Sequence, residues 1–246
     1  MSYDGLSPEE LACRLRTPSC LSLARVTSTL DIIHELAAEG APAGTVVLAD
    51  EQVAGRGRLG RKWSSPPNSG IWLSYLVRPS QPLEGGVLAI RVGLAVLSTL
   101  EEIGVAAYLK WPNDVVVSDR KLAGVLCEGR WLGTATQWVA VGVGINVRAP
   151  ADRAIDREAA TLDEFVPQIT RVSVLERLVP KLHAMPHQPR VMEEERERFD
   201  AHDWLAGKNV QAPLRGSACG IDGDGALLVR TANGVERILG GSVVTA

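Results

Sequence analysis

The chain has 246 residues, a length that allows one large domain or two small ones with a substantial core. Hydrophobic residues make up 46% and charged residues 22%, which excludes an intrinsically disordered or low-complexity protein. The formal net charge of -3 excludes a surface that binds nucleic acid over its whole area, but it is compatible with a local basic site.

Apolar spacing, capping residues and turn signals predict an α+β protein. A helix is expected at 7–16, where Ser7 caps the helix and Pro8 takes its first position. Strands and helices then alternate, and the last helix before residue 105 is long and faces the core. The expected ranges are a strand at 21–26, a helix at 28–39, strands at 45–49 and 70–77, and a helix at 83–103.

From residue 105 the strand signals follow one another without helices between them. The short turns that separate them predict antiparallel hairpins. The expected strands are 105–109, 114–117, 121–128 and 137–147.

The last third of the chain changes character twice. Residues 157–204 are helical and charged, and the run at 193–198 is interpreted as a solvent-exposed helix face. Short strands with Asp-Gly and Asn-Gly turns follow, which predicts a small all-β barrel. The expected domains are an N-terminal extension with a short helix (1–20), a central α+β domain (21–204) and a C-terminal β domain (205–246).

Four cysteines stand at irregular spacings without a C-x-x-C pair, which argues against a zinc ribbon or a redox motif. Cys13, Cys20, Cys127 and Cys219 are expected to be reduced thiols, mostly buried. Neither a signal peptide nor an apolar run long enough to span a membrane is recognisable in the sequence. A soluble cytoplasmic protein without a membrane partner is expected.

The densest cluster of candidate functional residues is the loop at 55–63, with the sequence GRGRLGRKW. Its glycines match G-x-G-x-x-G, but a dinucleotide fold is disfavoured, because that motif must open a helix and here two serines and two prolines follow. A flexible backbone that carries guanidinium groups can bind phosphate or carboxylate oxygens in bidentate fashion. A solvated surface loop, or a single-stranded nucleic-acid surface that combines cations with Trp63, are the alternatives.

Two further clusters place a lysine at a strand end beside a turn, in a chain with 21 Arg and only 5 Lys. They are KWPND at 110–114 and RKLAG at 120–124. Lysine supplies a compact charge that can lie between two anionic groups, whereas arginine favours planar pairing. A surface lysine whose stem packs on apolar neighbours is the alternative for each. Asp114 suits either an Mg²⁺ ion or the cap of a turn.

Together and in this order, these segments resemble those of the biotin–protein ligases, also called biotin–[acetyl-CoA-carboxylase] ligases. The resemblance covers residues 21–246 and is specific as a set, although no single piece would be. It rests on Ser28-Thr29, Gln52, GRGRLGRKW at 55–63, KWPND at 110–114, RKLAG at 120–124 and GVGINV at 142–147.

The resemblance implies a class II synthetase-like catalytic fold, with a central mixed β-sheet flanked by helices and an SH3-like β-barrel at the C-terminus. It also implies a two-step reaction. Biotin and MgATP give biotinyl-5′-AMP and pyrophosphate, and the biotinyl group then passes to a lysine of a biotin carboxyl carrier protein domain of acetyl-CoA carboxylase or another biotin-dependent carboxylase. ATP, Mg²⁺ and biotin take part as substrates, and no prosthetic group is implied.

The same resemblance assigns roles to residues at the matching positions. Lys121 would contact both the biotin carboxylate and the α-phosphate, and the catalytic set would be Lys121, Arg56, Arg58 and Asp114. Asp114 would also serve Mg²⁺. The biotin site would comprise Ser28, Thr29, Gln52, Gly55, Arg56, Arg58, Lys121 and Gly124. The ATP site would comprise Arg58, Arg61, Trp63, Lys110, Asn113, Lys121 and Asn146.

Two features depart from the family pattern. Leu30 stands where the family commonly has Asn after Ser-Thr, which leaves one polar contact near biotin open. The stretch before the first strand is too short for the winged-helix domain of some members, so no sequence-specific DNA binding and no repressor function are expected. Family members often dimerise through edge strands, and 139–147 is the candidate edge of a homodimer.

Three other functions stay open beside the biotin ligase. A lipoate–protein ligase or an octanoyl transferase shares the catalytic fold, but the RGR and KWPND motifs together favour biotin. A nucleic-acid-binding module would use the Arg-rich loop, and its affinity would fall steeply with salt. A biotin sensor without transfer activity would keep the binding motifs.

Overall fold

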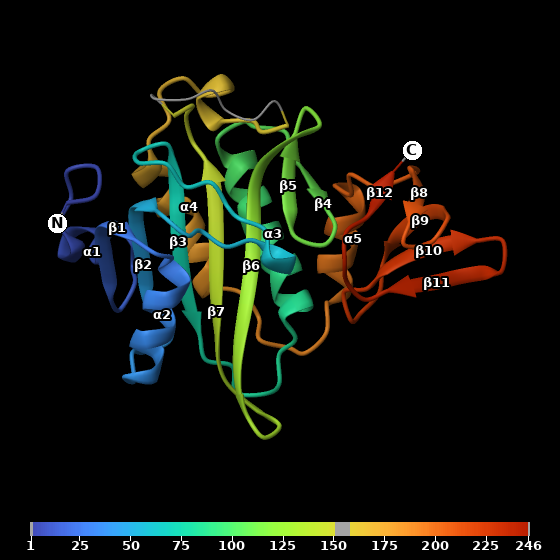
Figure 1. Cartoon of the computed structure of the whole chain (residues 1–246), viewed down its shortest axis with the longest axis horizontal. Helices are drawn as coiled ribbons and strands as arrows, with labels where there is room; N and C mark the ends of the chain where they lie inside the picture. Colours follow the sequence, from blue (N-terminus) through green and yellow to red (C-terminus); the bar gives the residue numbers. More distant parts are fainter. Residues whose placement is uncertain (1, 151–157, 246) are drawn as a thin grey trace.

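Two β-sheets form the protein, and most helices pack on the larger sheet (Figure 1). The computed structural model describes residues 2–150 and 158–245. The helices are α1 (Pro8–Leu15), α2 (Thr29–Ala38), α3 (Gly85–Glu102), α4 (Arg171–His183) and α5 (Glu193–Ala201), with two 3-10 turns, η1 (Arg58–Gly60) and η2 (Leu162–Glu164). The larger sheet contains β1 (Cys20–Val26), β2 (Val46–Gln52), β3 (Gly70–Val77), β4 (Tyr108–Lys110), β5 (Asp114–Val117), β6 (Arg120–Leu132) and β7 (Ala135–Asn146).

The seven strands of the larger sheet lie in the order β1-β2-β3-β7-β6-β5-β4. β1 and β2 run parallel, and the other neighbouring pairs are antiparallel. A parallel pair needs a crossover connection, which α2 supplies between β1 and β2. The expected α+β class with a central mixed sheet is therefore confirmed, as are the antiparallel hairpins from β4 to β7.

Local sequence explains where the first two helices begin. Ser7 and Glu10 form a capping box at α1, in which each side chain accepts a hydrogen bond from the backbone N–H of the other. Ser28 caps α2 by accepting from the N–H of Leu30. The Ser28 hydroxyl also lies 3.4 Å from the amide oxygen of Gln52, so the start of α2 is fixed beside the end of β2.

The two faces of the larger sheet are covered differently, because successive side chains of a strand point to opposite faces. α1, α3 and α4 pack on one face, whose core includes Val46 and Leu48 of β2. α2 packs on the other face, and Figure 1 shows it in front of the sheet with α3 and α4 behind. The small core beneath α2 consists of Leu30, Ile33, Ala37, Val47, Leu76 and Ala140.

The strand expected at a dimer edge lies inside the sheet. Residues 139–146 of β7 pair with β3 on one side, and β7 pairs with β6 on the other. Its backbone groups are therefore used by two neighbours, and a second chain cannot pair with it there. The prediction for 139–147 was wrong, because strand order is not a local property of the sequence. The edges of this sheet are β1 and β4, and a homodimer itself stays a prediction.

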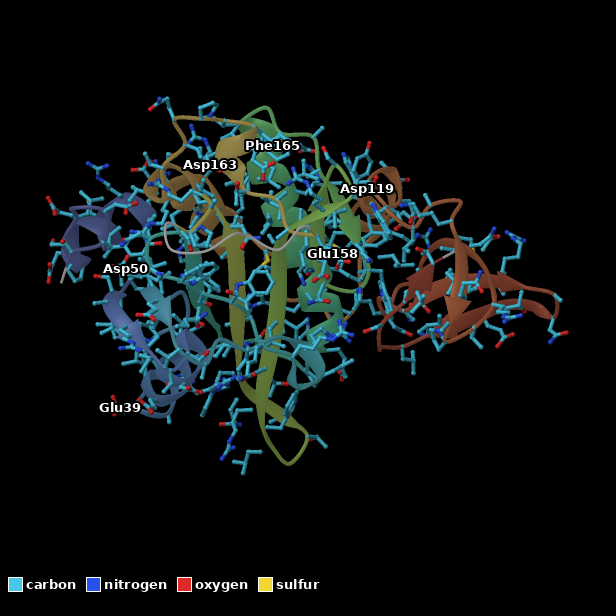
Figure 2. All side chains as sticks on the ribbon, turned by 45° about the horizontal axis from the view of Figure 1, so that its top comes forward. Glu39, Asp50, Asp119, Glu158, Asp163 and Phe165 are labelled. Atoms are coloured by element: carbon cyan, nitrogen blue, oxygen red, sulfur yellow. The ribbon has the colours of Figure 1, made fainter. Side chains whose placement is uncertain are left out.

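The N-terminal residues pack against the rest of the fold. Tyr3 is 1% exposed and Leu11 is fully buried. Arg171, the first residue of α4, is 2% exposed and forms ion pairs with Asp4 and Asp50. Asp50 lies among the N-terminal elements in Figure 2. One buried guanidinium thus ties the start of the chain, β2 and α4 together.

The chain ends in a five-stranded antiparallel sheet of order β11-β10-β9-β8-β12. The predicted Asn233-Gly234 turn is displaced by one residue, because Ala232 and Asn233 form the turn between two of its strands and Gly234 is the first residue of the second of them. Trp111 links the two sheets, since its Nε1 donates a 2.9 Å hydrogen bond to the carbonyl of Gly225. The SH3-like barrel stays a prediction. The strands are β8 (Asn209–Ala212), β9 (Gly216–Ile221), β10 (Leu227–Thr231), β11 (Gly234–Ile238) and β12 (Val244–Thr245).

The charged run at 193–198 is not simply a solvated face. Glu195 of α5 accepts a 2.7 Å hydrogen bond from Arg91 of α3, whose side chain is 1% exposed. An arginine buried on α3 needs a carboxylate partner, and α5 supplies it. The ion pair therefore docks α5 against α3, which the charge pattern alone did not indicate.

All four cysteines are free, but Cys13 and Cys219 are exposed, Cys127 is half-buried and Cys20 is buried, so the expectation of mostly buried thiols was wrong. Leu11 and Leu15 take the buried face of α1, which leaves Cys13 pointing outward.

In the described part of the chain, no helix is both long and apolar enough to cross a membrane.

Candidate functional site

A cavity of about 210 Å³ opens on the α2 face of the larger sheet, beside the first turn of α2. The loop at 55–63 forms one wall, and in Figure 1 the segment that carries η1 crosses in front of β7 and β6. The remaining walls come from the connection between β4 and β5, from β6 and β7, and from residues 241–243 near the C-terminus. The cavity therefore collects segments from nearly the whole length of the chain.

Most of the site residues expected from the sequence meet in this cavity. Gly55 and Asn146 do not line it. A Cβ added at Gly55 would lie 2.5 Å from the carbonyl oxygen of Trp63, and Asn146 donates to the backbone carbonyl of Lys121 at 3.3 Å, so both support the walls. The expected residues that line it are Ser28, Thr29, Gln52, Arg56, Arg58, Arg61, Trp63, Lys110, Asn113, Asp114, Lys121 and Gly124.

Two glycines on adjacent strands leave a flat slot in the floor. Gly124 of β6 and Gly144 of β7 are register partners, and the indole of Trp63 lies against both. A Cβ added at these glycines would come within 2.8 Å and 2.4 Å of indole carbons, respectively, closer than real Cβ atoms approach. The buried indole N–H has no hydrogen-bond partner among the described residues. The slot therefore accepts a flat ring, here that of Trp63.

Lys121 and Asp114 face each other beside this slot. The Lys121 ammonium lies 2.6 Å from the Asp114 carboxylate and 5.0 Å from the centre of the Trp63 ring. β5 and β6 are hydrogen-bonded neighbours, and this pairing brings the two side chains together. The Lys121 side chain is 38% exposed, so its charge remains available to an anion in the cavity.

A polar corner lies at the start of α2. The amide oxygen of Gln52 accepts from the N–H and the hydroxyl of Thr29, at 2.9 and 3.1 Å. Its amide nitrogen donates to Ser65 at 2.7 Å, and Ser74 donates to the Thr29 hydroxyl at 2.8 Å. These bonds hold hydroxyl and amide groups in fixed directions. Such a corner suits an uncharged polar ring, because a few placed hydrogen-bonding groups orient a ligand in a pocket.

Two loop arginines have only long hydrogen bonds to the other described side chains and carbonyl groups. Arg58 lies 3.3 Å from the amide oxygen of Asn113 and 3.4 Å from the carbonyl oxygen of Gly241, and Arg61 donates to Ser242 at 3.2 Å. Partial burial lowers the pKa of Arg58 below its ordinary value. Bonds of this length are weak, so both guanidinium groups can exchange them for an anionic ligand.

Arg56 is bound differently from its neighbours in the loop. Its guanidinium pairs with Asp31 of α2 and with Glu128 of β6, although it also lines the cavity. The bidentate contact with Glu128 has distances of 3.1 and 2.9 Å. Arg56 thus already has two carboxylate partners inside the protein.

Lys110 points toward the segment that leads to the C-terminal sheet. Its ammonium lies 4.5 Å from the ring centre of Trp204, and that of Lys208 lies 3.1 Å from the same ring. The indole N–H of Trp204 donates to Asp119 at 2.7 Å, and Figure 2 shows Asp119 on this side of the molecule. Lys110 therefore contributes to the cavity rim from a position fixed by an aromatic ring.

The described residues contain no group of three or more His, Cys, Asp or Glu side chains that could hold a metal ion. Asp114, the expected ligand of Mg²⁺, offers a single carboxylate that already contacts Lys121. Magnesium is commonly bound through one or two carboxylates together with substrate phosphates and water. These residues therefore fit a magnesium ion that arrives with a nucleotide.

Three parts of the site were missed by the sequence reasoning. Residues 241–243 line the cavity from the far end of the chain, and no local pattern marks them. Gly142 and Gly144 belong to the GVGINV motif, and glycines at alternate positions of a strand could have indicated the slot. Asp31 and Glu128 bind the first arginine of the loop, and neither belongs to a motif.

Two family models match the chain. The model described as "Biotin/lipoate A/B protein ligase family" covers residues 22–146, and the one described as "Biotin protein ligase C terminal domain" covers residues 207–245. The first range holds nearly all of the cavity, and the second holds the C-terminal sheet and residues 241–243.

Similar proteins and structures carry names of the same kind. The Bifunctional ligase/repressor BirA of Bacillus subtilis (strain 168) is 31% identical over 226 residues, which covers 87% of this chain and 70% of that protein. The Biotin--[acetyl-CoA-carboxylase] ligase of Mycobacterium tuberculosis is 37% identical over 170 residues, or 66% of this chain and 62% of that protein. The structure of the biotin protein ligase from Aquifex aeolicus in complex with biotin and ATP matches with a TM-score of 0.75 and 31% identity, covering 93% of this chain and 99% of that one.

Proposed function

The chain belongs to the biotin/lipoate A/B protein ligase family, and from this premise we propose that it activates biotin with MgATP and transfers the biotinyl group to a lysine of a biotin carboxyl carrier protein domain. The observation that carries the proposal is a single cavity in which a fixed hydroxyl and amide corner, a flat glycine slot and several cationic side chains meet. The ligase resemblance noted in the sequence is thereby confirmed at the level of the family.

In the first step, a carboxylate oxygen of biotin attacks the α-phosphorus of ATP, and pyrophosphate leaves. Both reactants are anionic, so the site must neutralise their charges and hold them in line. Lys121 suits this role, because its ammonium projects into the cavity beside the glycine slot. Arg58, Arg61 and Lys110 would bind the polyphosphate, and Asp114 would meet the magnesium ion that accompanies it.

The two substrates divide the cavity between them. The polar ring system of biotin would occupy the corner formed by Ser28, Thr29 and Gln52, where donors and acceptors are already oriented. The adenine would lie near Trp63 and Asn113, at the end of the cavity closer to the C-terminal segment. The chain of biotin that carries the carboxylate would run between these two places and reach Lys121.

In the second step, the ε-amine of the carrier lysine attacks the acyl carbon of biotinyl-5′-AMP. An amide bond forms, AMP leaves with the bonding electrons, and the amine gives up its proton. An unperturbed lysine has a pKa of about 10.4, so the attacking group must lose a proton to become nucleophilic. Asp114 is the carboxylate in the cavity that could receive it.

Biotin is proposed rather than lipoate because the corner beside α2 offers hydrogen bonds, which a ring with an amide-like head group can use and a disulfide ring cannot. The named relatives point the same way. We expect the protein to act in the cytoplasm, together with a biotin-dependent carboxylase as its partner.

Biotin-dependent exchange of labelled pyrophosphate into ATP tests the proposal, because only reversible adenylation returns the label. Exchange is expected with biotin and not with lipoate. Exchange with lipoate alone would identify a lipoate ligase, and absence of exchange with either acid would rule out adenylation. Transfer to a purified biotin carboxyl carrier domain, followed by mass spectrometry, tests the second step.

A further inference from the structure

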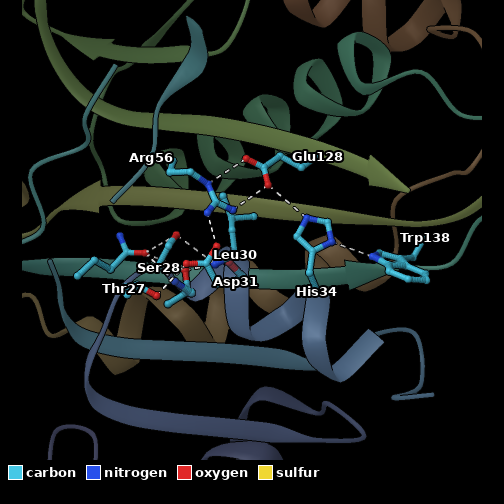
Figure 3. Close-up of polar contacts among 11 residues, drawn as sticks. Thr27, Ser28, Leu30, Asp31, His34, Arg56, Glu128 and Trp138 are labelled. Atoms are coloured by element: carbon cyan, nitrogen blue, oxygen red, sulfur yellow. Dashed lines mark hydrogen bonds and ion pairs between the residues drawn. The ribbon is translucent and has the colours of Figure 1, made fainter. Parts of the chain in front are cut away.

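Arg56, the first cation of the loop at 55–63, is clamped between two elements of the fold (Figure 3). Asp31, in the first turn of α2, accepts from one guanidinium nitrogen. Glu128, in β6, accepts from the other two at 3.1 and 2.9 Å. Asp31 is itself oriented, since its second oxygen accepts a 2.8 Å hydrogen bond from Thr27. The loop therefore begins at a side chain that bridges a helix and a strand.

A histidine and a tryptophan extend this arrangement behind Glu128. The indole N–H of Trp138 can only donate, so Nδ1 of His34, 2.9 Å away, must accept. His34 then carries its proton on Nε2, which lies 3.2 Å from Glu128 and donates to it. The hydrogen bond from His34 is the largest cause of the lowered pKa of Glu128, and Arg56 adds to it. The chain of bonds thus runs from β7 through α2 and β6 to the loop (Figure 3).

These two carboxylates leave Arg56 little capacity to bind another anion. Each of its three nitrogens already faces a carboxylate, and the two carboxylates together outweigh its charge. Among the described residues Arg58 and Arg61, by contrast, have only long hydrogen bonds to neutral oxygens, at 3.2 to 3.4 Å. Bidentate arginine–carboxylate pairs fix orientation more firmly than such contacts. Arg56 therefore anchors one end of the loop, while the rest of the loop can rearrange.

We propose that Asp31 and Glu128, with His34 behind Glu128, are positioning residues that latch Arg56 and so hold the loop over the activated acyl intermediate. This inference rests on the proposed ligase function, because it assigns the loop a reactive mixed anhydride to retain. Without the latch, biotinyl-5′-AMP would leave the cavity or meet water, which converts it to biotin and AMP. The latch thus raises the share of intermediate that reaches the carrier lysine.

Two single substitutions, Asp31→Asn and Glu128→Gln, test the latch. Each removes one negative charge and keeps the shape of the side chain. The matched control is Glu176→Gln, which breaks an exposed ion pair with Arg14 at a distance from the cavity. The readout is the amount of AMP released per carrier biotinylated, measured with wild-type protein alongside. We expect this ratio to rise ~10-fold in both latch variants, equivalent to ~1.4 kcal/mol, and to stay unchanged in the control.

A second measurement follows the loop without relying on activity. Trypsin cuts after arginine and lysine, so cleavage between Arg58 and Lys62 reports how often the loop opens. Cleavage should be faster in Asp31→Asn and Glu128→Gln than in the control, at a temperature where thermal melting shows all of them folded. A latch variant that is not folded there would be replaced by Glu128→Asp, which keeps the charge on a shorter side chain.

Two substitutions at His34 test whether its hydrogen bonds, rather than its ring, support Glu128. His34→Gln keeps an acceptor for Trp138 and a donor for Glu128, whereas His34→Phe keeps only the ring. The ratio of AMP to biotinylated carrier should be close to the wild-type value in the first variant and raised in the second. Wild-type ratios and cleavage rates in both Asp31→Asn and Glu128→Gln would overturn the latch. Absence of biotin-dependent pyrophosphate exchange in the wild-type protein would instead overturn the proposed function.

Discussion

The contacts of Lys121 allow its role in catalysis to be tested separately from a role in stability. It contacts Asp114 and the ring of Trp63, and none of these groups lies in the main core. Lys121→Ala should lower biotin-dependent pyrophosphate exchange ~100-fold or more, because it removes a preorganised charge from the reacting phosphate. Urea unfolding should show a change of less than ~1 kcal/mol. A loss of stability as large as the loss of activity would make Lys121 a structural residue.

Gly144 tests the slot in the cavity floor. An added methyl group would come 2.4 Å from an indole carbon, so Trp63 must move in Gly144→Ala. We expect altered tryptophan fluorescence and a ~10-fold loss in kcat/KM for adenylation, equivalent to ~1.4 kcal/mol of transition-state binding. Gly86→Ala is the control, because nothing lies within 4 Å of a Cβ at that position. Identical behaviour of the two variants would show that the slot has no function.

The residues predicted from motifs and those missed differ in a physical way. Lys121, Asn113 and Arg58 were found because charges and turns that serve one site recur at short spacing in the chain. Glu128 was not found, because its partner Arg56 lies 72 residues away and nothing near Glu128 in sequence needs that carboxylate. Side chains that act across elements become visible only when the sheet order is known.

At the scale of elements, buried ion pairs rather than apolar contacts alone fix how the helices dock. Arg171 of α4 is 2% exposed, and its partners Asp4 and Asp50 come from the N-terminal segment and from β2. Arg91 of α3 holds α5 in the same manner. The positions of most strands and helices followed from periodicity, but these pairings, and the place of β7 inside the sheet, depend on topology.

Arg171→Met should therefore destabilise the fold by ~3 kcal/mol, since it leaves two carboxylates without their cation. Urea denaturation at neutral pH measures the loss. Substituting the carboxylates too, in Asp4→Asn/Asp50→Asn/Arg171→Met, should recover part of it, because no unpaired charge remains. If the triple variant were no more stable than Arg171→Met, packing of the arginine stem rather than charge would account for the effect.

At the scale of the whole molecule, the C-terminal sheet takes part in the site and its junction with the larger sheet carries a buried acid. Residues 241–243 line the cavity, so the second family domain contributes directly to it. Asp203 lies at the junction, 7% exposed and bridged to Leu109 of β4. One of its oxygens accepts from the N–H of Leu205 at 2.8 Å, and the other has no hydrogen-bond partner among the described residues.

Burial raises the pKa of Asp203 from 3.8 to about 6. Between these two pH values the folded protein holds a proton that the unfolded chain has lost, so the free energy of unfolding falls as pH rises. The total fall is ~3 kcal/mol, and roughly half of it occurs between pH 5 and 7.5. Asp203→Asn cannot titrate, and urea unfolding should show it gaining ~1.5 kcal/mol relative to wild type across that interval. Glu194→Gln, at an exposed carboxylate of α5, should show no such gain. If the free energies of unfolding of wild type and Asp203→Asn ran parallel against pH, Asp203 would be charged in the folded protein throughout this range. Water would then reach the junction more readily than the burial of Asp203 indicates.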